Sequence, residues 1–420
     1  MAFSFVHTAD LHLDCPFEGL GEVPPELAAL LKDSTFRALD RIVDLCIERK
    51  TTFLVVAGDV YNATDKSLRA QLRLQNSLAR LAEAGIPSYI VHGNHDPANG
   101  WSAALDWPDT AHFLSSGKCG TFPVICHGTE IASVSGISYP KGAVTENLAA
   151  RLSPPKDSPF SVAVLHCNCG QVGGYEPYSP CTLDELVLSG FDYWALGHIH
   201  KGSILRKQAP VVLYPGNPQG LNPKETGPKG CYLIHVSDTK VVDLEFVETD
   251  AVRWSYAKVA CSGMTREQEL IDKAQETLDE IRNQAGRPAL VRLFLTGRTA
   301  LHRTLARPNL LREITEGLRG IGCAPDEIVW LESIQNQTKL DIDLEERRIS
   351  EDFLGDFLRA IQEARANSEK LAELKDVLKP LFSDRRGHKY LPELNDEQLL
   401  AWLDEAENYG LDALIGGAEE

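Results

Sequence analysis

The chain has 420 residues, of which 43% are hydrophobic and 24% charged, and its formal net charge is −18. The length is too great for one ordinary core and favours two or three domains, and the composition is that of a soluble globular protein. The negative charge argues against broad nonspecific attraction to nucleic acid. Residues 341–420 hold 10 lysine or arginine and 21 aspartate or glutamate residues, so most of the negative charge lies there and a basic path elsewhere stays open.

The sequence shows no sign of a membrane segment. No basic region precedes a long apolar run at the N-terminus, and no later window approaches the length needed to cross a bilayer. The ten cysteines are spread through apolar segments, as at Cys46, Cys126, Cys231 and Cys261, which favours free buried thiols over disulfides. We therefore expect a cytoplasmic protein.

The N-terminal part of the chain alternates strands with helices. The spacing of apolar residues predicts strand, helix, strand, helix and strand over residues 3–7, 34–47, 53–57, 66–84 and 86–91. Ser34 is the expected N-cap of the first helix, and Gly85 ends the second. This βαβ order predicts a parallel sheet, and ligands collect at the carboxyl ends of such strands.

From about residue 122 the pattern changes to short strands joined by glycine and proline turns. Thr182 and Glu185 form a capping box that opens a short helix. The strands are predicted at residues 131–137, 162–165, 191–196, 211–214, 230–236 and 241–247. A second sheet packed on the first accounts for them.

The C-terminal part reads as two further units. Strands and helices alternate over residues 256–261, 265–284, 289–296, 308–319 and 327–332, which predicts a small α+β domain. After Thr338 the sequence is acidic and helical, with apolar stripes at residues 353–361 and 371–381. The expected domains are residues 1–250, 251–338 and 339–420.

Polar side chains follow the predicted strands in a set that suits metal binding. The set contains two carboxylates, one amide and four imidazoles: Asp10, His12, Asp59, Asn94, His166, His198 and His200. Imidazole and carboxylate together suit a pair of divalent cations such as manganese, iron or zinc. Two such ions about 3.5 to 4 Å apart share a carboxylate, generate a hydroxide and stabilise an in-line displacement. The chemistry that fits is hydrolysis of a phosphate ester.

Each cluster alone has a simpler explanation. A single histidine after a strand is more often a satisfied core or surface residue, and Gly-Asp is a common turn. Five such clusters in order, each at a strand end, favour the metal site over this explanation.

These clusters resemble the five signature blocks of the calcineurin-like metallophosphoesterase family, in the family's order across residues 1 to about 250. Within it, the chain is most similar to the DNA repair exonuclease branch, which includes the SbcD type and the YhaO-like group. Residues 214–220 and 225–227 look closest to the YhaO-like group. The resemblance implies an α/β (α+β) fold, a two-sheet αββα metallophosphoesterase sandwich followed by a small α+β cap domain and a helical tail.

The resemblance also implies roles for the site residues. One metal would be held by Asp10, His12 and His200, the other by Asn94, His166 and His198, with Asp59 bridging. His95 would meet the phosphate or protonate the leaving oxygen, and Asp96 would fix its ring. The expected cofactor is a pair of manganese ions, with iron, zinc and magnesium as alternatives.

Basic residues adjoin the last two site-forming segments. The candidates for contacts to backbone phosphates of DNA, all expected in loops, are Lys201, Arg206, Lys207, Lys224 and Lys229. The alternative is that they are ordinary solvated loop charges.

The tail and a cysteine pair each have two interpretations. The resemblance implies that the tail helices dock on the coiled-coil root of an SMC-like ATPase of the YhaN or SbcC type. The alternative is a self-packed appendage, and Gly355 and Pro380 exclude a long regular coiled coil. Cys167 and Cys169 would bind a third ion, sense oxidation or be spectator thiols, and the absence of a completing zinc set favours the last.

The combined expectation is a metal-dependent phosphodiesterase that cleaves DNA as an exonuclease or endonuclease, in DNA repair with that ATPase. A homodimer is also compatible with the sequence. One alternative is a phosphoesterase for small nucleotides or phosphomonoesters, because the same site serves many leaving groups. Another is a scaffolding subunit with a structural metal site, against which the intact His95 argues.

Overall fold

The computed structural model describes residues 2–170, 174–319, 328–383 and 394–416. The chain forms two compact units: Met1–Ser255 with Ile281–Val291 and Cys323–Trp330, and Tyr256–Glu280 with Arg292–Gly322 and Leu331–Glu420. The predicted domain boundaries at 250 and 338 stay predictions, and the predicted strand start at Glu327 lies outside the described residues. Within the described ranges, none of the helices has the length and apolar character of a membrane span.

The first sheet has six strands in the order β12-β11-β1-β2-β3-β4. Strands β1 to β4 run parallel, whereas β11 pairs antiparallel with β1 and β12 antiparallel with β11. The bounds are Ala2–Thr8 (β1), Phe53–Ala57 (β2), Ser88–Val91 (β3), Ala111–Phe113 (β4), Gly230–Ser237 (β11) and Lys240–Glu248 (β12). The predicted parallel βαβ order is confirmed. The short strand β4 was not predicted.

The second sheet also has six strands, in the order β5-β6-β7-β8-β10-β9. Its four central strands are parallel, and β5 and β9 pair antiparallel at the two edges. The bounds are Gly120–Cys126 (β5), Thr129–Gly136 (β6), Ser161–His166 (β7), Tyr193–Gly197 (β8), Ser203–Arg206 (β9) and Val211–Tyr214 (β10). The last two predicted strands do not belong to it, because they form β11 and β12 of the first sheet.

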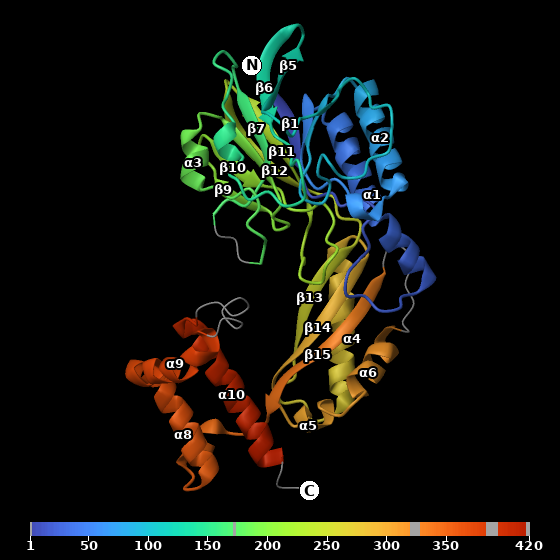
Figure 1. The fold of residues 1–420 in the computed structure, drawn as a ribbon. Helices are drawn as coiled ribbons and strands as arrows, with labels where there is room; N and C mark the ends of the chain where they lie inside the picture. Colours follow the sequence, from blue (N-terminus) through green and yellow to red (C-terminus); the bar gives the residue numbers. More distant parts are fainter. Residues whose placement is uncertain (1, 171–173, 320–327, 384–393, 417–420) are drawn as a thin grey trace. The chain divides into compact units, whose positions relative to one another are not determined.

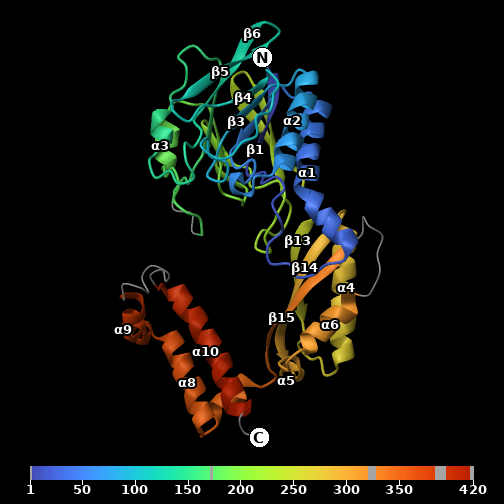
Figure 2. The same cartoon turned by 45° about the vertical axis from the view of Figure 1, so that its right-hand side comes forward.

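The side chains of β2 alternate between two cores, which sets the layers of the fold. Phe53 and Val55 pack between the sheets, whereas Leu54 and Val56 pack against α1 (Pro25–Glu48) and α2 (Leu68–Glu83). Helices α1 and α2 lie side by side over the outer face of the first sheet (Figures 1 and 2). A strand buried on both faces explains why this segment reads as one continuous apolar run.

On the outer face of the second sheet, α3 (Leu183–Leu188) begins with the predicted capping box. The hydroxyl of Thr182 accepts from the backbone of Glu185, and the carboxylate of Glu185 accepts from the backbone of Thr182. Trp194 of β8 donates its indole N–H to the carbonyl of Leu186 at 3.0 Å. The N-terminal part of the chain is therefore a two-sheet sandwich between helical layers, as predicted.

One predicted helix start is wrong. Helix α1 begins at Pro25, nine residues before the expected cap, and Ser34 lies inside it. Proline suits the first helical turn because it has no N–H to leave unpaired. The hydroxyl of Ser34 donates to the carbonyl of Leu31 at 2.8 Å, so it is satisfied within the helix instead of capping it.

The segment after residue 252 forms a three-stranded sheet in the order β13-β14-β15. Its strands are Arg253–Ala260 (β13), Ala289–Thr299 (β14) and Val329–Leu340 (β15), and its helices are Glu267–Ala285 (α4), His302–Leu305 (α5) and Leu310–Arg319 (α6). The predicted α+β character of this segment is confirmed. Two single-turn helices complete the N-terminal part, at Ala63–Asp65 and Ala149–Arg151.

The described residues of the tail form four helices. They are Leu344–Ile349 (α7), Phe353–Ala366 (α8), Ser368–Ser383 (α9) and Asp396–Gly416 (α10). Leu354 and Leu358 of α8 are buried against Leu411 of α10, so part of the predicted apolar stripe packs within the tail. Val377 and Leu381 of α9 stay 74% and 57% exposed.

Candidate metal centre

The candidate ligands lie just beyond the carboxyl ends of parallel strands in both sheets. Asp10 and His12 follow β1, Asp59 follows β2, and Asn94 follows β3. From the second sheet, His166 ends β7, and His198 and His200 follow β8. The two sheets thus bring segments almost 200 residues apart to one edge of the sandwich.

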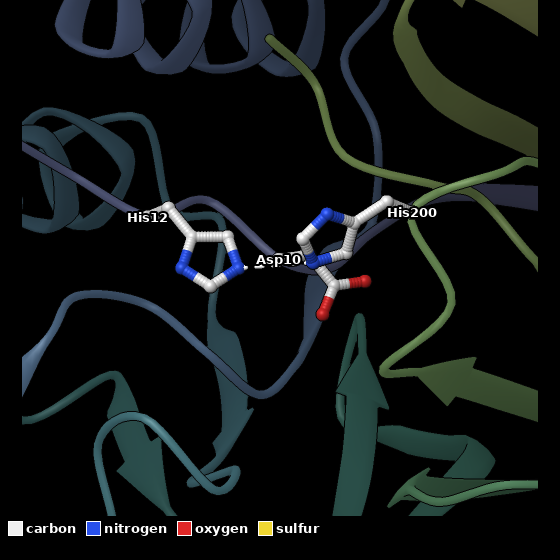
Figure 3. Close-up of side chains that lie close together, drawn as sticks. All are labelled: Asp10, His12 and His200. Atoms are coloured by element: carbon white, nitrogen blue, oxygen red, sulfur yellow. Dashed lines mark hydrogen bonds between the residues drawn. The ribbon is translucent and has the colours of Figure 1, made fainter. Parts of the chain in front are cut away.

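Asp10, His12 and His200 form the first group. Their ligand atoms lie within 4.8 Å of one another. The two imidazoles point toward each other, with 3.2 Å between His12 Nε2 and His200 Nε2, and the carboxylate of Asp10 lies beside them (Figure 3). These are the three residues predicted to hold one metal.

Asp10, Asp59 and His166 form the second group, again within 4.8 Å. His166 Nε2 lies 3.3 Å from Asp59 Oδ2 and 2.9 Å from Asn94 Oδ1. Asp59 Oδ2 is also 3.9 Å from His12 Nε2, so this carboxylate lies between the two groups, as a bridging ligand must. Asp10 belongs to both groups, which the sequence did not indicate.

His198 is placed differently from its predicted role. Its ring nitrogen Nε2 lies 2.9 Å from the carbonyl oxygen of Glu176, and its ring belongs to neither group. Its backbone N–H instead donates to both oxygens of Asp10, at 3.0 and 3.2 Å. The contact to Asp10 is a positioning role, and ligation by the ring stays a prediction.

His95 is exposed above the first group, with its ring 5.0 Å from that of His12. The prediction that Asp96 fixes this ring is wrong. The buried carboxylate of Asp96 accepts from the backbone N–H groups of Gly93 and Asp59, at 2.7 and 3.2 Å, and lies 3.3 Å from His92 Nδ1. In the part of the chain that the structure describes, no hydrogen bond joins Asp96 to the His95 ring. Asp96 therefore shapes the loops after β2 and β3.

The backbone at the site is unusual. Asp10, His12, Asp59 and His198 have φ angles of 52°, 43°, 50° and 100°, in the left-handed region that residues with a side chain rarely adopt. Such conformations persist only where the surroundings impose them, and they gather at functional sites. A Cβ atom at Gly93 would lie 2.2 Å from Asp59 Oδ1, so glycine is needed there for close approach.

Burial and charge set the protonation of the donors. Burial raises the pKa of Asp10 to about 6 and lowers the pKa of His12 to about 3. Burial also acts on the pair of Asp59 and His166, but their mutual attraction prevails: the pKa of His166 is raised to about 9, and that of Asp59 is held below its usual range. At neutral pH the ring of His166 is therefore protonated, and its Nε2 lies 2.9 Å from Asn94 Oδ1 and 3.3 Å from Asp59 Oδ2, where a metal ion would take the place of the proton.

A cavity of about 1670 Å³ opens onto the first group, and His12, His95 and His200 line it. The exposed residues Lys201 and Lys224 also line this cavity, hereafter the groove. Its volume exceeds the roughly 300 to 1,000 Å³ of ordinary small-molecule pockets.

Two of the five predicted DNA-contacting residues are not exposed loop residues. Lys229 is only 8% exposed, and its Nζ donates to the carbonyl of His200 at 2.9 Å. Arg206 ends strand β9, is partly buried and donates to the carbonyl of Ala209. Lys207 is exposed but is not among the residues that line the groove.

The sequence did not assign roles to two residues that touch His200. Glu225 Oε1 lies 2.5 Å from His200 Nδ1, and the hydroxyl of Tyr175 accepts from the His200 backbone at 3.2 Å. Glu225 was noted only as part of a resemblance, and no local pattern marks Tyr175.

The cysteine pair beside His166 is buried together with a third thiol. Cys167 Sγ lies 3.8 Å from Cys181 Sγ, and Cys169 pairs with Cys181 in an isolated β-bridge. A hydrogen bond with a neighbouring thiol, and after it burial, raises the pKa of Cys169 and of Cys181, which disfavours reactive thiolates. This agrees with spectator thiols.

Comparison with known proteins assigns the family. Residues 3–202 match the model of calcineurin-like phosphoesterases, and residues 254–339 match the middle domain of metallophosphoesterase YhaO. The uncharacterized metallophosphoesterase YhaO of Bacillus subtilis is 37% identical over 342 residues, which cover 81% of this chain and 83% of that protein. The chain belongs to the calcineurin-like phosphoesterase family.

More distant relatives of this calcineurin-like phosphoesterase carry the name DNA double-strand break repair protein Mre11. The protein from Sulfurisphaera tokodaii is 25% identical over 201 residues, covering 46% of this chain and 50% of that protein. The protein from Methanocaldococcus jannaschii is 26% identical over 262 residues, covering 59% of this chain and 66% of that protein.

The donor set fits a pair of divalent cations. Buried carboxylate and imidazole groups converge in two groups that share Asp10, and the amide oxygen of Asn94 joins the second. Hard oxygen donors mixed with imidazole suit first-row divalent ions. The chain is therefore a metal-dependent phosphoesterase by family and by site chemistry.

Replacing Gly93 by alanine should weaken binding of Mn²⁺ by about tenfold or more, because the new Cβ displaces Asp59. Calorimetric titration with Mn²⁺ measures the change. Gly117→Ala is the matched control, since nothing lies within 4 Å of a Cβ there. Equal affinity in both variants would contradict the prediction.

Metal binding should release a proton from His166. The pKa of His166 is about 9, so the ring is protonated at a pH below that value, and it must lose this proton to bind a metal ion. The apparent affinity for the metal should therefore rise by up to about tenfold for each unit of pH. Titration near pH 7 in two buffers of different ionisation enthalpy counts the protons. His166→Asn should release one proton fewer, and a heat independent of buffer would refute the assignment.

Proposed function

We propose that this calcineurin-like phosphoesterase hydrolyses phosphodiester bonds of DNA, as an exonuclease or endonuclease that uses two manganese ions. The observation that carries the proposal is a pair of converging groups of metal donors, the first of which contributes His12 and His200 to the lining of a groove of about 1670 Å³. A groove of this size accommodates more than a single nucleotide. Relatives named for repair of DNA double-strand breaks support the same substrate.

Each residue of the site has a task in this proposal. Asp10, His12 and His200 would hold one ion, and Asn94, His166 and the ring of His198 would hold the other, with Asp59 between the two. The two ions, when bound, supply Lewis-acid activation of the phosphodiester and of the attacking water. Holding the donors in buried, strained backbone positions fixes their geometry before the substrate arrives.

His95 is the proposed catalytic acid. Its ring is exposed toward the groove, and its backbone N–H donates to Asp59 Oδ1 at 2.9 Å, which places the ring over the donors without joining them. From there it donates a proton to the leaving oxygen or a hydrogen bond to the phosphate. Lys201 and Lys224, exposed along the groove, would contact flanking phosphates.

We further propose an SMC-like ATPase as partner, with the tail as the docking segment. Leu354 and Leu358 of helix α8 pack within the tail, whereas two apolar residues of α9 stay exposed and offer a surface for a partner helix. Val377 and Leu381 are one helical turn apart and exposed, a spacing that suits packing against a second helix.

The nuclease proposal is tested with end-labelled double-stranded and single-stranded DNA in Mn²⁺. The wild-type chain should release nucleotides, and His95→Asn should slow release about 10²- to 10⁴-fold with both ions still bound, because only the proton donor is lost. Metal content measured on the same samples separates chemistry from binding. His112→Asn, on strand β4, is the control.

Two outcomes would contradict this prediction. Loss of bound metal in His95→Asn would make that residue a ligand. Rapid turnover of a cyclic nucleotide without any DNA cleavage would favour the small-nucleotide phosphoesterase instead.

Docking is tested by co-purification with a co-expressed SMC-like ATPase. The double variant Val377→Asp with Leu381→Asp should lose the complex, since charges on the stripe cannot be buried against a helix. Leu188→Asp, at a leucine that is 85% exposed on α3, introduces the same change elsewhere and should retain the complex. If the α9 variant keeps the complex with the ATPase, the docking proposal is contradicted.

A further inference from the structure

Both ring nitrogens of His200 have a close partner. Its Nε2 faces the metal groups, 3.2 Å from His12 Nε2 (Figure 3), and its Nδ1 lies 2.5 Å from Glu225 Oε1. The backbone is held as well, because the carbonyl accepts from Lys229 Nζ at 2.9 Å. The carboxylate of Glu225 therefore occupies the position behind the ring, on the side away from the donors.

Glu225 does not depend on His200 for its place. Its other oxygen, Oε2, accepts from the backbone N–H of Leu221 at 2.8 Å and of Asn222 at 3.2 Å, and from Asn217 Nδ2 at 2.9 Å. These donors belong to the loop that follows β10. The loop thus presents a carboxylate of fixed position and leaves one oxygen for the imidazole.

Among the described residues, no carboxylate outside the second group hydrogen-bonds to His166, and the nearest carboxylate oxygen to its Nδ1 is Oδ1 of Asp10, itself a donor of the group, at 3.8 Å. The outer nitrogen of His166, Nδ1, lies 2.9 Å from the carbonyl oxygen of Ala57, which is a neutral acceptor. A carboxylate that accepts an imidazole N–H fixes the tautomer and raises the basicity of the other nitrogen more than a carbonyl does. The two metal positions therefore differ in the strength of their imidazole donors.

We propose that Glu225 is a positioning residue that acts through His200 and makes the position at Asp10, His12 and His200 the tighter of the two metal positions. Glu225 orders the filling of the centre: the first ion enters beside His200 and the second beside His166. The inference rests on the proposed two-metal function, but it concerns binding and not the reaction.

The test is titration of the metal-free full chain with Mn²⁺, followed by calorimetry and by electron paramagnetic resonance of the bound ion. The wild type should bind two ions in separate steps. Glu225→Gln keeps the size of the side chain and removes the charge, and it should weaken the first step about 10- to 100-fold while leaving the second unchanged.

Glu18→Gln is the matched control. Glu18 also lines the groove and accepts from Asn222 Nδ2 at 2.6 Å, but its contacts lie with the loop and not with His200. Its substitution removes the same charge and should leave both steps as in the wild type. Equal weakening in the two variants would show a general effect of charge and overturn the proposal.

A double-mutant cycle separates positioning from mere support of the loop. If Glu225 acts through His200, then Glu225→Gln should have no further effect on ion affinity in a His200→Ala background. A full effect in that background, or wild-type affinity in Glu225→Gln alone, overturns the proposal.

These results are distinct from those for the proposed function. Ordered binding of two ions without DNA cleavage would contradict the nuclease and leave the role of Glu225 intact. If the wild type cleaves DNA and the Glu225→Gln variant binds both ions with wild-type affinity, the nuclease proposal is supported and the role of Glu225 is contradicted.

Discussion

The candidate metal centre depends on contacts between the two sheets at one edge of the sandwich. Asp10, after β1 of the first sheet, accepts the backbone N–H of His198, after β8 of the second. His166, at the end of β7, lies 2.9 Å from the carbonyl of Ala57 at the end of β2. A Cβ at Gly197 would lie 1.9 Å from that carbonyl, so only glycine allows the approach.

This approach has an electrostatic consequence. Asp10 and Asp59 are each 1% exposed and lie within ligand distance of shared histidines, so two carboxylates are held together away from water. Such a group is unfavourable unless positive charge compensates it. The pKa of His166 is raised, so its protonated ring supplies part of that charge in the metal-free chain, and bound divalent cations would supply more. Burial therefore links the stability of the site to its occupancy.

The surroundings of the centre are built from segments that do not follow its strands directly. Glu225 reaches His200 from the loop after β10, and Lys229 reaches the same residue from just before β11. Three mistaken predictions have one feature in common, because each side chain bonds to backbone: Ser34 to the carbonyl of Leu31 in its own helix, Asp96 to the N–H groups of Gly93 and Asp59, and Lys229 to the carbonyl of His200. The sequence suggests that such a polar side chain is available to cap a helix, to act in catalysis or to contact DNA. In the folded chain it is hydrogen-bonded to backbone instead.

The sequence by itself determined the alternation of strands and helices, the sandwich and the candidate ligands, because burial imposes periodic apolar residues and strand ends expose polar ones. The tertiary structure alone decided how these residues meet: that Asp10 is common to both groups, that the His198 ring turns to Glu176, and that Glu225 stands behind His200. The physical reason is that hydrogen bonds between residues distant in the chain leave no periodic trace. Local spacing records burial along one element, whereas a site made by two sheets is set by their packing.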